Sequence, residues 1–262
     1  MNKLFYKFTI TLSVVCIFCQ CSNNSEEKNI ENGINILSAS ELFLPIIDDS
    51  YIYPVVPGTD AWENLGSIED IYEVSQLPDR VLKSISTLGL IRSILDIPGL
   101  DGFYLASSNS SPIGTLYRIF AHYNSVSELE KRKDSGNALI SFYNAVNIDG
   151  LNSSSVGERM LLSIQHTALE ILFTKPAILQ QFDLRQKKQL ITSLLARHNQ
   201  IAQVQYEGFI VNGTITVIAW ILYNSKYEPI VQYYGNNAIA EYFDVRTDQT
   251  DDIIEFANDF IK

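Results

Sequence analysis

The spacing of apolar positions along the chain is that of a helical protein. From residue 67 onward, aliphatic and aromatic residues recur every three or four positions, which places them on one face of successive helices. The pattern predicts helices over residues 68–76, 78–85, 87–97, 112–123, 127–133, 135–147, 156–173, 184–204, 236–243 and 250–261. Short connections between them predict an all-α array of short antiparallel helices, either an αα-hairpin bundle or an irregular superhelix.

Three segments refine this prediction. The β-branched run 214–223 is compatible with a buried strand or a buried helix, and we expect a helix because no partner strand is evident nearby. Residues 156–173 are apolar around most of the helix circumference, which predicts burial on several sides. Pro45, Pro54 and Pro57 favour an extended segment ahead of the first helix, since proline disfavours helix at the preceding residue.

Several predicted helix starts carry residues that can cap an N-terminus. Ser67 and Ser86 can each accept a hydrogen bond from the first turn that follows, and Asp183 can do the same for 184–204. The sequence IDGLNSSS at 148–155 is the best candidate for an internal boundary. We therefore predict a single helical domain over 41–262, with two lobes meeting near 148–155 as the alternative.

The first twenty residues have the pattern of an export signal. Lys3 and Lys7 precede an apolar run over residues 8–19, which is shorter than the roughly 20 residues that a membrane-spanning helix needs. Cys21 closes a Phe-Cys-Gln-Cys sequence that resembles a lipobox, and the chain then becomes polar. The pattern predicts a signal peptide over 1–20 and lipidation of Cys21, with an ordinary cleaved signal peptide as the alternative.

The stretch that follows is typical of a tether. Residues 21–40 are rich in serine, asparagine and glutamate, so they cannot bury enough apolar surface to offset their ordering entropy. The acidic start of this stretch resembles signals that send bacterial lipoproteins to the cell surface. We expect an exported protein that is lipid-anchored in the cell envelope, in the outer membrane, with the periplasmic or surface-exposed face left open.

Composition and charge narrow the function classes. Removing residues 1–20 takes away two lysines and no acid, so the net charge falls from −11 to −13. Such an acidic chain is a poor partner for nucleic acid and contacts the membrane through its lipid anchor only. All three cysteines lie within the first 21 residues, and no phosphate-binding, dinucleotide or zinc motif is present. We therefore expect no cofactor and no metal site.

One helix carries a set of residues that could support chemistry. Arg159, Ser163, His166 and Glu170 are spaced four, three and four apart, so they form one stripe on the helix 156–173. A hydroxyl, an imidazole and a carboxylate in line are the groups of a nucleophile, its base and an orienting acid. One straight helix does not readily aim a serine at a histidine, so we favour a polar helix face and assign no catalytic residue.

The C-terminal region contains a partial calcium-loop pattern. Asp244, Asp248, Asp252 and Glu255 occupy positions 1, 5, 9 and 12 of a twelve-residue frame. The frame lacks the glycine that its sharp turn requires. We favour an acidic helix start, with Thr250 as the cap, over a calcium site.

Tyrosines interleaved with amides make the best candidate for a binding surface. Tyr233, Tyr234 and Asn236 flank Gly235, and the hypothesis is that they lie exposed beside a turn. Tyrosine offers a flat apolar ring and a hydroxyl, which suits protein interfaces and sugar stacking, and the amide could bind hydroxyl groups. The competing interpretation, which we favour, is that these rings pack in the core between the last helices.

Short motifs between residues 54 and 147 carry a family resemblance. They are Pro57-Gly58-Thr59 with Trp62, Leu77-Pro78, Val81-Leu82, Ser86-Thr87 with Leu90, and Asp134-Ser135-Gly136. Together they resemble a group of uncharacterised secreted or lipid-anchored proteins of gut Bacteroidetes. The resemblance implies an exported helical protein and brings no activity with it. Physically, Pro-Gly-Thr is a turn leading into a helix cap, and we expect Trp62 to be buried in the core.

Three functions remain open. The first is a lipid-anchored binding or scaffold module whose unknown partner is a protein or a glycan, and we favour it. The second is a hydrolase that uses the stripe or carboxylates from separate helices. The third is a structural accessory of an envelope complex.

Overall fold

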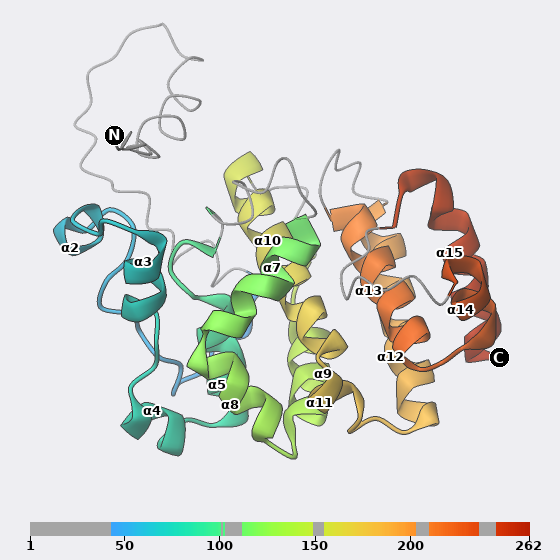
Figure 1. Ribbon diagram of the computed structural model, residues 1–262, viewed down its shortest axis with the longest axis horizontal. Coiled ribbons are helices and arrows are strands. Elements are labelled where there is room, and N and C mark those ends of the chain that lie inside the picture. The colour runs from blue at the N-terminus through green and yellow to red at the C-terminus, as the bar shows by residue number, and fades with distance from the viewer. Residues whose placement is uncertain (1–42, 101, 103–111, 149–154, 203–209, 236–244) are drawn as a thin grey trace, which may run out of the picture. The chain divides into compact units, whose positions relative to one another are not determined.

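The computed structural model describes residues 43–100, 102, 112–148, 155–202, 210–235 and 245–262. All regular secondary structure in these ranges is helical, with no β-strand among them, which confirms the predicted all-α array (Figure 1). None of the helices in this part of the chain is long and apolar enough to cross a bilayer. The predicted signal, Cys21 and tether lie outside the described residues.

The helices fall into two groups along the chain. Those before residue 149 are α2 (Asp60–Glu63), α3 (Ile68–Val74), α4 (Asp79–Ser84), α5 (Thr87–Leu95), α7 (Pro112–Ile119), the 3-10 helix η1 (Phe120–His122), α8 (Asn124–Lys131) and α9 (Ser135–Ala145). Those after it are α10 (Val156–Thr174), α11 (Pro176–Leu179), α12 (Leu184–Ala202), α13 (Ile210–Asn224), α14 (Glu228–Tyr234), the 3-10 helix η3 (Thr247–Gln249) and α15 (Thr250–Ile261).

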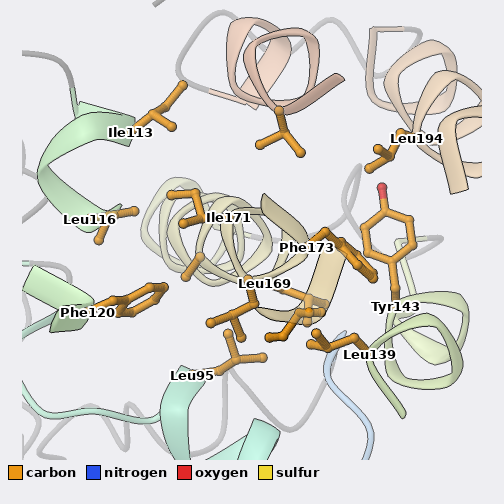
Figure 2. Close-up of a cluster of buried hydrophobic side chains, with 14 of the residues drawn as sticks. Leu95, Ile113, Leu116, Phe120, Leu139, Tyr143, Leu169, Ile171, Phe173 and Leu194 are labelled. Carbon is orange, nitrogen blue, oxygen red and sulfur yellow. The ribbon is translucent and has the colours of Figure 1, made fainter. Parts of the chain in front are cut away.

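The helix α10 packs against several helices from both groups. It contacts α5, α7 and α9 from the first group and α13 from the second (Figure 1). Every side chain from Leu162 to Lys175 is buried, which confirms the predicted burial on several sides. Figure 2 shows residues of α10 meeting apolar side chains from its neighbours, namely Leu95, Leu116, Phe120, Leu139 and Tyr143.

The helix α13 forms the core of the second group. It contacts α10 on one side and α12, α14 and α15 on others. Its side chains from Thr214 to Leu222 are all buried. The β-branched run 214–223 is therefore a buried helix, as expected, because its isoleucines and valines face other helices on all sides.

Helix caps agree with the sequence at three predicted starts. The hydroxyls of Ser67 and Ser86 accept hydrogen bonds from the backbone N–H groups of Asp70 and Gly89. Asp183 and Gln186 cap α12 reciprocally, with hydrogen bonds of 2.7 and 3.0 Å. Each bond satisfies an N–H group that the first helical turn would otherwise leave without a partner.

The segment with the prolines is extended, as predicted, and it lies against α5. The hydroxyl of Ser93 on α5 accepts a hydrogen bond from the backbone N–H of Tyr51, and the Ser93 carbonyl accepts one from the hydroxyl of Tyr53. The carboxylate of Asp49 accepts two hydrogen bonds from Ser86, at the start of the same helix. These side-chain bonds replace the backbone ladder that an extended segment without a partner strand lacks.

Three expectations need correction. Trp62 is half-buried rather than a core residue, and its ring packs against Gly99, where any Cβ would lie within 2.9 Å of it. A helix that the pattern missed, α14, precedes the predicted helix 236–243, which lies outside the described residues. Thr250 is the first residue of α15 instead of its cap, because η3 continues directly into that helix.

Truncation of Leu169 on α10 should strongly destabilise the fold. The side chain is fully buried where α10 meets its neighbours, so Leu169→Ala leaves a cavity and should lower the free energy of unfolding by about 2–5 kcal/mol. Leu184→Ala is the matched control because Leu184 is 60% exposed at the start of α12. Urea unfolding followed by circular dichroism measures both. Equal losses in the two variants would contradict the central role of α10.

Candidate functional site

The predicted stripe on α10 leads into a buried polar cluster. The carboxylate of Glu170 accepts hydrogen bonds from the hydroxyl of Tyr143 on α9 at 2.8 Å and from that of Thr214 on α13 at 2.9 and 3.1 Å. Nδ1 of His166, one turn earlier, lies 3.5 Å from Oε1 of Glu170. Together with Arg197 of α12, these residues form what we call the Glu170 cluster, and they join four helices.

Arg197 closes the cluster against the end of α9. Its Nη2 donates to the backbone carbonyls of Tyr143 and Val146, each at 3.2 Å, and its guanidinium lies 5.4 Å from the centre of the Tyr143 ring. The last carbonyls of a helix lack the N–H donor four residues further on that those in its interior have, and the helix dipole favours a positive charge there. Arg197 therefore serves as the C-terminal cap of α9.

Burial decides the charge of the cluster. It raises the pKa of Glu170 to about 8, although the hydrogen bonds from Tyr143 and Thr214 favour the carboxylate. Burial, together with the charge of Arg197, lowers the pKa of His166 to about 3. The 3.5 Å separation of Glu170 and His166 would permit an ion pair. Because both groups are fully removed from water, we assign a neutral acid and a neutral imidazole at neutral pH.

The stripe is not the solvent-facing polar surface that the sequence favours. Ser163, His166 and Glu170 are at most 1% exposed because α10 has helices on several sides. Neither the Ser163 hydroxyl nor either ring nitrogen of His166 has a hydrogen-bond partner in the described residues. A nucleophile needs a hydrogen bond to its base and access to a substrate, and this stripe shows neither. The cluster connects helices instead.

Lys175 is a further buried polar group, and no pattern in the sequence predicts its burial. Lys175 lies at the end of α10, with its Nζ 3.8 Å from the centre of the Tyr117 ring and 3.4 Å from the Tyr117 carbonyl. Burial lowers the pKa of Lys175 to about 8, although Glu130 acts in the opposite direction. Its contacts with the aromatic ring and the carbonyl attach the end of α10 to α7.

The predicted binding surface lies on α14 and is in part exposed. The Tyr233 ring is 39% exposed, and it packs edge-to-face on Tyr234 and on Phe256 of α15, with centroids 5.1 and 5.4 Å apart. Its hydroxyl donates to the Asp252 carboxylate at 2.7 Å, a bond that raises the pKa of Tyr233. We call Tyr233, Tyr234 and Phe256 the aromatic surface.

The other two predicted residues differ from Tyr233. Tyr234 is half-buried, and burial raises the pKa of its hydroxyl to about 12, so its ring belongs partly to the packing between α14 and α15. Asn236 lies outside the described residues. The turn at Gly235 is present, with a φ of 71° that favours glycine at this helix end.

The partial calcium frame does not gather its acids within the described residues. Asp248 forms a bidentate pair with Arg246, at 2.8 and 3.0 Å, and Asp252 accepts the hydroxyl of Tyr233. No group of three or more His, Cys, Asp or Glu that could hold a metal ion occurs in this part of the chain. Asp244, the first position of the frame, lies outside it.

Comparison with known proteins leaves the chain without a match, whether to a protein-family model, a curated protein or a solved structure. The contacts described above are therefore the basis for assigning a function.

The Glu170 cluster predicts a specific pH dependence of stability. The native acid keeps its proton up to about pH 8, whereas the unfolded acid loses it near its ordinary value of 4.5. This contribution to stability is therefore complete below pH 4.5 and is lost as the pH rises to 8. His166 has the opposite pH dependence because its pKa is lowered in the folded state. Its contribution to the stability of the fold is complete above pH 6.5 and is lost as the pH falls to 3.

Glu170→Gln should remove the loss on the alkaline side. Glutamine can accept the same hydrogen bonds from Tyr143 and Thr214 and does not ionise. The melting temperature of Glu170→Gln minus that of the native protein should be higher at pH 8.5 than at pH 5. Each kcal/mol of stability that the native protein loses over this range should add about 2–4 °C to the difference. Differential scanning calorimetry measures this, with exposed Glu255→Gln on α15 as the control. A difference that stays constant with pH would show that Glu170 is charged in the native state.

Proposed function

We propose that this protein is an exported, lipid-anchored binding module of the cell envelope, and that the aromatic surface on α14 and α15 contacts its partner, a protein or a glycan. The exposed ring of Tyr233 is the observation that carries the proposal. Large apolar side chains with this exposure are few in the described residues, and Tyr233 is the only aromatic one among them.

The geometry of Tyr233 suits a binding residue. Its ring is held by edge-to-face contacts with Tyr234 and Phe256, and its hydroxyl is held by Asp252, so little freedom remains to be lost when a partner binds. Tyrosine is enriched among the residues that dominate binding energy at interfaces. The ring face would accept either an apolar side chain or the C–H face of a sugar.

The N-terminal sequence is the basis for proposing that the protein is exported and lipid-anchored. A basic start, a short apolar run and Cys21 in a lipobox-like sequence support export and lipidation. The polar stretch 22–40 would separate the helical domain from the lipid, by roughly 25 Å if it behaves as a flexible chain. Such spacing would let a surface near the C-terminus reach a partner beyond the bilayer.

Truncation of Tyr233 should impair binding and leave folding nearly intact. Tyr233→Ala removes the exposed ring, and partner capture should fall about tenfold or more, as at interface hot spots. Tyr233→Phe keeps the ring and removes only the bond to Asp252, so it should retain most capture. Exposed Asn258→Ala on α15 is the surface control. The assay is cross-linking of tagged protein in intact cells followed by mass spectrometry, together with a glycan array.

Two results would reject the aromatic surface as the binding site. The first is unchanged capture by Tyr233→Ala. The second is a loss of about 3–5 kcal/mol in stability, which would be typical of a fully buried aromatic residue.

Substitution of Cys21 tests the lipid anchor separately. Cys21→Ser removes the thiol that would carry the lipid, so the folded protein should leave the membrane fraction and the detergent phase of a phase-partition experiment. The helical circular dichroism spectrum should be unchanged because Cys21 lies ahead of the described domain. Retention of Cys21→Ser in the membrane fraction would contradict lipid anchoring without affecting the proposal for Tyr233.

A further inference from the structure

A cleft of about 370 Å³ lies between α9 and α12. Its floor is apolar and consists of Ile140, Leu190 and the Tyr143 ring. Its rim carries two amides, Asn144 and Gln189, and two hydroxyls, Thr192 and Ser193. The volume is within the range of about 300–1,000 Å³ that is usual for small-molecule sites. This cleft is formed by helices other than those that carry the aromatic surface.

The cleft arises because α9 and α12 are joined near both ends. At their N-terminal ends, Nε2 of Gln186 lies 3.5 Å from Oδ1 of Asn137. At the C-terminal end of α9, Arg197 of α12 binds the last carbonyls of α9. The side chains between these two links leave the cleft open. Since the links are made in the structure as it stands, the cleft is preformed, and a ligand would not need to separate the helices.

The lining selects a neutral ligand with both polar and apolar faces. None of the described side chains that line the cleft is charged, so an ionic ligand would lose its hydration without gaining a counter-charge. A wholly apolar ligand would bury the amides and hydroxyls of the rim without hydrogen bonds. The Thr192 hydroxyl donates to the Lys188 carbonyl at 2.9 Å, so its oxygen is available to accept a hydrogen bond from a ligand.

We propose that the cleft between α9 and α12 binds a neutral carbohydrate. A sugar ring has a C–H face that can lie on the apolar floor and a set of hydroxyls that both donate and accept. The amides of Asn144 and Gln189 also donate and accept, so each can bind a pair of neighbouring hydroxyls. This site is independent of the proposed role of Tyr233, and either can fail without the other.

The experiment is a titration followed by the methyl groups in the cleft. The full helical chain, labelled with ¹³C at isoleucine and leucine methyls, is mixed with glucose, galactose, mannose, N-acetylglucosamine, lactose, maltose and cellobiose in turn. The signals of Ile140 and Leu190 should shift and saturate with at least one sugar. Glucose 6-phosphate and glucuronate should shift them less than glucose does. A stronger response to the charged sugars, or no saturable shift with any neutral sugar, would overturn the proposal.

Variants then assign the binding to this cleft. Ser193→Trp fills it and should abolish the response, with thermal melting used to check that the variant folds. Gln189→Ala removes one rim amide from an exposed position and should weaken binding about tenfold, which corresponds to one hydrogen bond of about 1.4 kcal/mol. Gln200→Ala changes the same residue type at an exposed position of α12 outside the lining and should bind normally. Unchanged affinity in Gln189→Ala together with binding by folded Ser193→Trp would place the sugar elsewhere.

Discussion

The hydrogen bonds that the carboxyl group of Glu170 accepts inside the core constrain how the surrounding helices pack. An acid with no access to water must remain protonated, be paired with a charge or accept hydrogen bonds, because an unsatisfied buried carboxylate is strongly destabilising. Here Tyr143 and Thr214 supply those hydrogen bonds from two other helices. Satisfying one side chain therefore sets how α9, α10 and α13 approach one another.

Arg197 extends this constraint to a fourth helix. Its guanidinium binds the C-terminal carbonyls of α9, and its charge contributes to keeping His166 neutral. The same contacts define one end of the cleft between α9 and α12. Tyr143 belongs to both features, with its hydroxyl bound to Glu170 and its ring in the cleft floor. A ligand in the cleft would thus contact the ring of a residue that belongs to the Glu170 cluster. In the aromatic surface, the ring of Tyr233 contacts Tyr234 on its own helix, α14, and Phe256 on α15.

The local features of the sequence predicted the helices well. The caps at Ser67, Ser86 and Asp183 mark helix starts because each depends only on a side chain and the turn that follows it. Residues 156–173 are apolar around most of the helix, and this pattern predicted a buried helix because it too can be read within one segment. The short helix α14 was missed because it has one fully buried residue, Ile230, and therefore little periodic signal. The half-buried position of Trp62 was also missed, since it results from the contact with Gly99 across a long sequence separation.

The sequence is enough to predict the helical class of the described domain, most of its helix boundaries and the polar spacing of the stripe on α10. These follow from periodicity and capping, which act over a few residues. That the stripe faces the core follows only from the packing of the neighbouring helices around α10. A helix surface carries no information about which neighbours will cover it, and the partners of Glu170 come from 27 residues before it and 44 residues after it. The cleft between α9 and α12 could not be predicted from the sequence either, because its floor and rim come from helices that meet only in the folded chain.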